Sequence, residues 1–307
     1  MDNILIIDGM NNIHRANTIF GKRSHNRCEG GFTCGHKTLE LHCECGGIWD
    51  SIDEKCLKDV TEEYVLIYNF FRNLRATVEQ FSPDKIFFVL EGHPEHRYAI
   101  YPQYKANRII KQANKQESRD KFNEAVAIIV KLLKNLPITT VRAAKFECDD
   151  VIGTLVENLK DESVTIFSND SDFTQLLQKG YSNLKLYNPI KKEYVVAPEY
   201  PYLYWKALNG DASDNISKLL TPAKALKAIN NPEILSKFME LEENRANFNI
   251  NKELIEIKMV PDEDLIVEDG IANWEDLKTS FNSMRFNSIT NDKSWNKYKE
   301  TFDCVKF

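Results

Sequence analysis

Hydrophobic residues along this chain follow two alternating patterns. Short runs rich in apolar and β-branched residues have the length of buried strands and occur at residues 4–7, 86–90, 138–141, 164–167 and 184–187. Between them, apolar residues recur at helical spacing over 64–78 and 126–133. Strands that alternate with helices predict βαβ units and a mostly parallel sheet with helices on both faces. The fold class expected is therefore α/β.

Beyond about residue 200 the strand pattern fades and the sequence becomes helical. We therefore expect a catalytic core over 1–200 and a helical C-terminal region over 201–307. Two stretches of the core do not follow the alternation of strands and helices. Residues 21–59 carry Gly, Cys, His and charge without periodicity and are interpreted as an insertion, while residues 97–121 contain seven Lys or Arg against two acids.

Acidic residues follow the predicted strands. The sites of ligands in parallel sheets lie at the carboxyl ends of the strands, so these acids are expected along one edge. LNGDASDNI adds two further acids, three residues apart and on one face if helical. The acids in question are Asp8, Glu91, Glu147, Asp149, Asp150, Asp170, Asp172, Asp211 and Asp214.

Each of these acidic groups also has an ordinary structural explanation as a turn, a helix cap or a charge at a helix N-terminus. Together they would repel strongly along one sheet edge unless cations neutralised them. Oxygen ligands suit Mg²⁺ or Mn²⁺ rather than zinc. So many acids exceed the needs of one ion, and two ions typically serve displacement at phosphorus. The sequence thus predicts a two-metal site acting on a phosphodiester.

The basic stretch begins six residues after Glu91 and is expected to lie over the metal edge. Its cations can hold a phosphate, and its tyrosines can stack on a base. A solvated charged helix is the alternative interpretation. The basic residues are Arg97, Lys105, Arg108, Lys111, Lys115, Arg119 and Lys121, and the tyrosines are Tyr98, Tyr101 and Tyr104.

Composition and charge fit a globular protein: the chain has 307 residues, 42% of them hydrophobic and 28% charged. The formal net charge of −6 argues against nucleic-acid binding, but acids that hold metal ions reverse the local sign. No apolar run approaches the roughly 20 residues of a membrane span, and the N-terminus lacks a signal peptide. We therefore expect a cytoplasmic, monomeric protein without a membrane partner.

Five of the seven cysteines fall between Cys28 and Cys56. In a reducing compartment such clustering favours a metal site over disulfides. One hypothesis is a structural Zn²⁺ held by Cys34, His36, Cys43 and Cys45. The alternative is a surface insertion whose cysteines bind nothing, because the paired CxxC spacing of strong zinc signatures is missing.

Five segments in this order, IIDGMNNIHRA, RYAIYPQYKANR, ECDDVIGTL, SNDSDFTQLL and LNGDASDNI, resemble the 5′-nuclease family of flap endonucleases and bacterial polymerase 5′→3′ exonuclease domains. LKLYNPIKKEYV and NKELIEIKMVPDEDL are most similar to the ribonuclease H enzymes of T-even bacteriophages. The resemblance implies a PIN-like nuclease core that removes RNA primers and flaps from 5′ ends with two divalent ions. Its substrates would be DNA and RNA–DNA hybrids, and a single-strand-binding protein or sliding clamp would be its partner.

By motif, the resemblance assigns the nine acids to the metal cluster. It assigns Arg97, Lys105 and Arg108 to the scissile phosphate and Tyr104 to base stacking. Glu91 departs from the family's usual Asp. The segment after Asn215 lacks the glycines of the family's helical hairpin, so the hairpin is degenerate and Lys224 is its remaining basic contact. A PIN-type endoribonuclease and an inactive DNA-binding replication accessory are the alternative functions.

Overall fold

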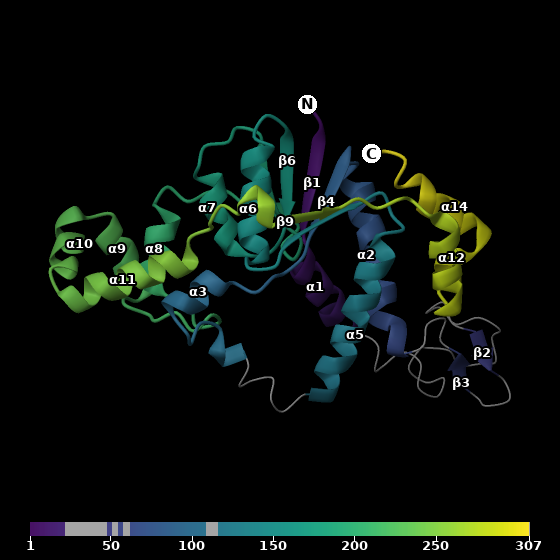
Figure 1. The fold of residues 1–307 in the computed structure, drawn as a ribbon, viewed down its shortest axis with the longest axis horizontal. Helices are drawn as coiled ribbons and strands as arrows, with labels where there is room; N and C mark the ends of the chain where they lie inside the picture. Colours follow the sequence, from purple (N-terminus) through teal and green to yellow (C-terminus); the bar gives the residue numbers. More distant parts are fainter. Residues whose placement is uncertain (22–47, 51–54, 58–61, 109–115, 307) are drawn as a thin grey trace.

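The computed structural model describes residues 1–307 except 22–47, 51–54, 58–61, 109–115 and 307. At its centre lies a seven-stranded sheet with the order β8-β7-β6-β1-β4-β5-β9 (Figure 1). Strands β7, β6, β1, β4 and β5 pair in parallel, and β8 and β9 form antiparallel edges. The strands are β1 (Asn3–Asp8), β4 (Lys85–Val89), β5 (Thr139–Ala143), β6 (Ser163–Phe167), β7 (Leu184–Asn188), β8 (Glu193–Tyr194) and β9 (Leu265–Glu268). The predicted mostly parallel α/β sheet is confirmed.

The two edge strands were not predicted from the sequence. Strand β8 has only two residues, and β9 is largely exposed, so neither carries the run of buried residues that marks an interior strand. A separate antiparallel pair, β2 (Ile48–Asp50) and β3 (Lys55–Leu57), lies within the predicted insertion at 21–59. Edge and hairpin strands need burial on one face at most, which explains their weak sequence signal.

Strand β1 shows how the sheet separates two cores. Its side chains alternate between faces, so Leu5 and Ile7 enter one core while Ile4 and Ile6 enter the other. Each fully buried aliphatic side chain of this kind contributes about 1.5–3 kcal/mol to folding. The first core lies under α1 (Gly9–Gly21), α2 (Val65–Phe81) and α5 (Gln116–Leu133), and the second under α6 (Cys148–Asn158) and α7 (Thr174–Leu177).

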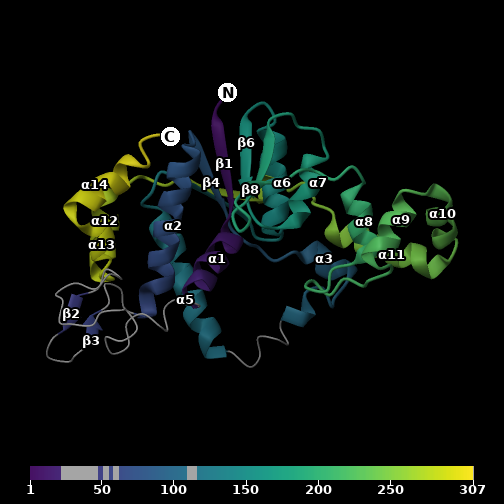
Figure 2. The same ribbon diagram turned by 180° about the vertical axis from the view of Figure 1, so that it is seen from behind.

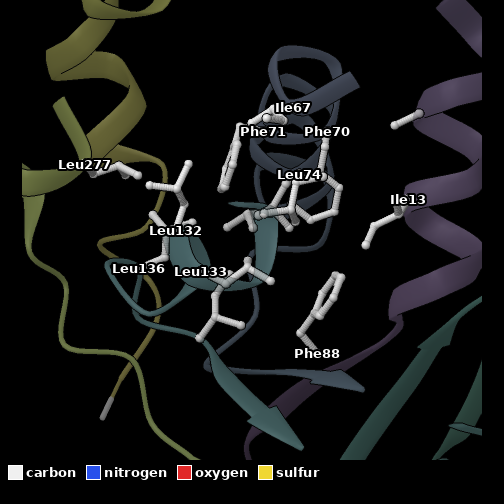
Figure 3. Close-up of a cluster of buried hydrophobic side chains, with 14 of the residues drawn as sticks. Ile13, Ile67, Phe70, Phe71, Leu74, Phe88, Leu132, Leu133, Leu136 and Leu277 are labelled. Atoms are coloured by element: carbon white, nitrogen blue, oxygen red, sulfur yellow. The ribbon is translucent and has the colours of Figure 1, made fainter. Parts of the chain in front are cut away.

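Aromatic side chains of α2 fill the centre of the first core. Figure 3 shows Phe70 and Phe71 of α2 converging with Leu132 and Leu133 of α5 and with Phe88 of β4. The rings of Phe70 and Phe88 meet edge to face, with 5.6 Å between their centroids. This packing fixes β4 beneath α2 and thereby fixes the position of the strand end that precedes Glu91.

The helices outside the sheet gather at its two ends (Figures 1 and 2). One group surrounds a small core that includes Leu208 and Phe248, and the other packs on α2, where the Phe71 and Phe281 ring centroids are 5.1 Å apart. The first group is α3 (Glu95–Ile100), α8 (Tyr202–Asn209), α9 (Pro222–Ile229), α10 (Pro232–Met239) and α11 (Glu242–Ile255). The second is α12 (Trp274–Ser283), α13 (Asn287–Thr290) and α14 (Asp292–Glu300). Short 3₁₀ turns span Glu62–Tyr64, Ser171–Phe173 and Asp262–Asp264.

The predicted helical character of the C-terminal region is confirmed, but the predicted division at residue 200 is wrong for its last part. Strand β9 pairs with β5 inside the main sheet, and α12 to α14 share a core with α2. A cut at residue 200 would separate both from their partners. Among the described residues, no helix is long and apolar enough to cross a membrane.

Candidate active site

Strand β1 ends at Asp8, whose side chain is buried at the carboxyl edge of the sheet. Its carboxylate accepts a hydrogen bond from the hydroxyl of Ser168 at 2.8 Å and one from the backbone N–H of Asn11 at 3.1 Å. Burial raises the pKa of Asp8 to about 6; these hydrogen bonds oppose the shift, and the charge of Asp170 adds to it. Asp8 is therefore a buried acid whose charge is only partly compensated.

Asp149 and Asp170 lie beside Asp8. Asp149 is in the first turn of α6, and Asp170 follows β6, where it accepts a hydrogen bond from the backbone N–H of Asp172 at 2.9 Å. Burial raises the pKa of Asp149 well above its usual range, and the charges of Asp170 and Asp8 raise it further. Ion pairs of the described chain involve other acids of this edge. We call Asp8, Asp149 and Asp170 the unpaired acids.

Glu91 stands at the same edge, two residues after the end of β4, and is exposed. The next residue, Gly92, is required by a close approach of two strand exits. A Cβ atom there would lie 2.0 Å from the carbonyl oxygen of Ala143 and 2.4 Å from that of Phe146. The absent side chain lets the backbone after β4 pass against the exit of β5, which keeps Glu91 at the edge of the acidic cluster.

Glu147 and Asp150 at the start of α6 are bound by Arg97 of α3. The guanidinium donates to both carboxylate oxygens of Asp150 at 2.5 and 2.8 Å and lies 3.1 Å from the Glu147 carboxylate. It also donates to the backbone carbonyls of Leu254 at 2.9 Å and Glu256 at 3.2 Å. Asp150 is 0% exposed and Arg97 is 2% exposed.

This arrangement corrects two predictions. All three guanidinium nitrogens of Arg97 are engaged inside the protein, so it cannot reach a substrate phosphate in this structure. Both oxygens of Asp150 accept from Arg97, and they also accept from the backbone N–H groups of Glu147 and Lys258. The pair therefore joins α3, α6 and the end of α11 rather than holding metal or substrate.

Tyr104 is also buried, at 3% exposed, and packs in the small core with Leu208. Its hydroxyl donates to Glu147 at 3.0 Å and lies 3.3 Å from Asp214. In this structure Tyr104 is not free to stack on a base, because its ring packs in the small core and its hydroxyl donates to Glu147; the stacking role stays a prediction.

Lys105, the next residue, is partly exposed and remains at the edge of the acidic cluster. Its ammonium pairs with Glu147 and lies 3.8 Å from Asp214. Its backbone has a φ of +57°, an uncommon conformation for a residue with a side chain, and its N–H donates to the carbonyl of Asp214 at 2.9 Å. Strained backbone of this kind gathers at functional sites.

Asp211 and Asp214 lie in a turn rather than a helix, closed by backbone hydrogen bonds between Asp211 and Ile216 at 2.8 and 3.1 Å. Asp214 pairs with Arg108, which is half exposed. The turn is further joined to the basic segment, since the Asn215 side chain donates to the carbonyl of Gln103 at 2.9 Å. The fold thus brings the second acidic group and the basic segment together.

Lys206 of α8 is a charged residue at this site that the sequence did not indicate. Its ammonium pairs with Asp172 and lies 3.0 Å from Asp211. The hydroxyl of Tyr202 also donates to Asp172, at 3.1 Å. A lysine two residues before LNGD could have been noticed as an acid partner, but nothing in the local sequence distinguishes it from a surface lysine.

The remaining predicted residues are scattered. Arg119 and Lys121 are exposed on α5, and Lys224 is exposed in the first turn of α9. Lys111 and Lys115 lie outside the described residues, as do the four zinc candidates Cys34, His36, Cys43 and Cys45. Their predicted roles stay predictions.

The unpaired acids fit hard divalent cations, because they are oxygen donors and the charge of Asp170 helps to raise the pKa values of Asp8 and Asp149. Among the described residues, no three His, Cys, Asp or Glu side chains stand close enough to enclose one ion. An ion here would therefore be held by one or two carboxylates with water completing its shell, as is usual for Mg²⁺.

A family model, the 5′-3′ exonuclease N-terminal resolvase-like domain, matches residues 52–200. The 5′-3′ exonuclease of Bacillus subtilis is 30% identical over 189 residues, which are 57% of this chain and 61% of that protein. Over these residues the chain is similar to the 5′-nuclease family. DNA polymerase I of the same bacterium is 26% identical over 62% of this chain and 23% of the polymerase. This chain thus spans less than two thirds of the length of either relative.

Solved structures share the fold of this chain. Flap endonuclease-1 from Methanococcus jannaschii aligns with a TM-score of 0.57 and 14% identity, covering 99% of this chain and 91% of the other. The 5′-exonuclease of bacteriophage T5 with bound zinc ions aligns with a TM-score of 0.55 and 16% identity, covering 98% of both chains. At these identities the likeness confirms the predicted PIN-like architecture.

Proposed function

We propose that this chain is a divalent-metal-dependent 5′→3′ nuclease that hydrolyses phosphodiesters at the 5′ ends or flaps of DNA and RNA–DNA hybrids. The observation that carries the proposal is the cluster of unpaired acids at the carboxyl edge of the sheet, with the ammonium of Lys105 beside it. Similarity to the 5′-nuclease family supports the reaction, and a bacteriophage T5 flap endonuclease of similar fold is known in complex with DNA and metal ions.

Asp8, Asp149 and Asp170 would hold the ions, which we propose to be two Mg²⁺ or Mn²⁺, with Glu91 contributing through water. Ions bound there would activate the attacking water and offset charge on the leaving oxygen. Lys105 is held at the edge by Glu147 and Asp214, where its charge can stabilise the scissile phosphate. Arg108, half exposed beside Asp214, and the exposed Arg119, Lys121 and Lys224 would bind the backbone of the nucleic acid.

The alternatives make different demands on the site. A PIN-type endoribonuclease would use the same acids but leaves the basic segment joined to Asp214 without a role. An inactive accessory is disfavoured because Asp8, Asp149 and Asp170 all keep their carboxylates. A single-strand-binding protein or sliding clamp as partner remains an expectation from the family alone.

The test is a cleavage assay on a 5′-flap DNA, a nicked duplex, an RNA–DNA hybrid and a single-stranded RNA, each with Mg²⁺ or EDTA. Cleavage of the first three near their 5′ ends, in Mg²⁺ alone, is the expected result. Asp170→Asn should abolish it, whereas Asp161→Asn, at the other end of β6 and exposed, should not. If only the single-stranded RNA is cleaved, the result favours a PIN-type endoribonuclease. If no substrate is cleaved, the result favours an inactive DNA-binding accessory.

A further inference from the structure

Lys206 neutralises a pair of acids that the resemblance assigns to metal. Its ammonium lies between Asp172, with which it pairs directly, and Asp211, whose carboxylate oxygen is 3.0 Å away. Only 8% of Lys206 is exposed. Its ammonium is therefore buried inside the site between two carboxylates.

The carboxylates that Lys206 contacts are also fixed from other directions. Asp172 accepts from the Tyr202 hydroxyl at 3.1 Å, and Asp211 accepts from the backbone N–H and the hydroxyl of Ser213 at 2.8 and 2.6 Å. In this geometry the ammonium occupies the space between the two carboxylates. The unpaired acids, in contrast, have no Lys or Arg partner in the described part of the chain.

We propose that Lys206 is a resident counter-ion that positions Asp172 and Asp211 and controls the binding of a second divalent ion. Such an ion binds these acids only by displacing the ammonium, so it binds more weakly than an ion at the unpaired acids. The inference rests on the proposed function, because it concerns the same metal site. It adds a competing cation within the protein, so that the two ion sites differ in affinity.

The experiment measures Mn²⁺ binding to substrate-free protein by isothermal titration calorimetry and by electron paramagnetic resonance of free Mn²⁺. In Lys206→Met, the weaker ion should bind at least tenfold more tightly than in the parent, because its competitor is gone. Lys206→Arg, which keeps a cation, should resemble the parent. The matched control is Lys306→Met, which removes a lysine that pairs with Asp84 at 2.5 Å, outside the acidic cluster. Equal Mn²⁺ binding by the parent and Lys206→Met would overturn the proposal.

Thermal melting gives a second readout that a purely structural lysine would not reproduce. Lys206→Met should melt well below the parent in EDTA, since Asp172 and Asp211 lose their counter-ion, and should recover in Mn²⁺ by more than the parent gains. If the variant folds only in Mn²⁺, that dependence supports the proposal. If Mn²⁺ restores neither folding nor stability, the proposal fails.

The double variant Lys206→Met/Asp172→Asn separates ion binding from general loosening of the site. With one carboxylate removed, the tighter Mn²⁺ site gained in Lys206→Met should disappear. Persistence of that site would show that Asp172 does not hold the ion and would overturn the assignment. Because these titrations use no substrate, their outcome is independent of the cleavage assay that tests the proposed function.

Discussion

Replacing Arg97 by methionine tests whether this residue is structural or acts on the substrate. Methionine fills much of the space but leaves the carboxylate of Asp150, which is 0% exposed, without a counter-charge. Asp150 would retain only the backbone N–H groups of Glu147 at 3.2 Å and Lys258 at 2.9 Å. Removing one partner of a buried ion pair costs about 3–5 kcal/mol, because the remaining charge is buried uncompensated.

We therefore expect Arg97→Met to lower the free energy of unfolding by about 3–5 kcal/mol, or the melting temperature by roughly 6–20 °C. Urea unfolding followed by circular dichroism measures the loss. Arg75→Met is the matched control, since Arg75 pairs with Glu79 at 3.5 Å on the surface and its loss should cost less than about 1 kcal/mol.

A second variant identifies the cause. Arg97→Met/Asp150→Asn removes the stranded charge and keeps one carbonyl oxygen, which can accept from one of the two backbone N–H groups, so it should recover part of the lost stability. The reasoning would be refuted by an Arg97→Met protein that unfolds within about 1 kcal/mol of the parent yet no longer cleaves substrate. That result would restore the role at the scissile phosphate that the family resemblance implies.

Three further substitutions test single steps of the reasoning. Gly153→Ala should destabilise the protein by about 1–3 kcal/mol, because the new Cβ would lie 2.4 Å from Cγ2 of Ile257. In a helix with open space at this position, the same change would stabilise by about 1 kcal/mol. In an Ile257→Ala background, Gly153→Ala should no longer lower the midpoint of urea unfolding. Tyr104→Ala should cost about 3–5 kcal/mol of stability as a core truncation, whereas loss of substrate affinity at unchanged melting temperature would reinstate base stacking. Lys105→Ala should slow single-turnover cleavage by about 10²–10³-fold with little change in affinity for the substrate. Arg119→Ala should instead weaken substrate binding and reduce the salt dependence of that binding. If Lys105→Ala changed affinity and Arg119→Ala changed the cleavage rate, the proposed role of Lys105 would be contradicted.

The sequence by itself determined the parallel core and the row of acids at its edge. Strands buried on both faces require continuous apolar runs, and parallel pairing places their carboxyl ends together, so Asp8 and Asp170 could be placed at one edge from local patterns. The short edge strands β8 and β9 carried no such signal, because they are not buried on both faces.

Only the tertiary structure decided which charges are available. Three residues that look like surface residues in the sequence are buried in the structure: Arg97, Tyr104 and Lys206. Arg97 of α3 is buried against Asp150 at the start of α6, and Lys206 of α8 is buried against Asp172. Whether a carboxylate meets an arginine, a lysine or another carboxylate depends on contacts between segments about 30 to 160 residues apart, which no local period encodes. The packing of these distant segments therefore separates the paired acids from Asp8, Asp149 and Asp170, which have no Lys or Arg partner among the described residues.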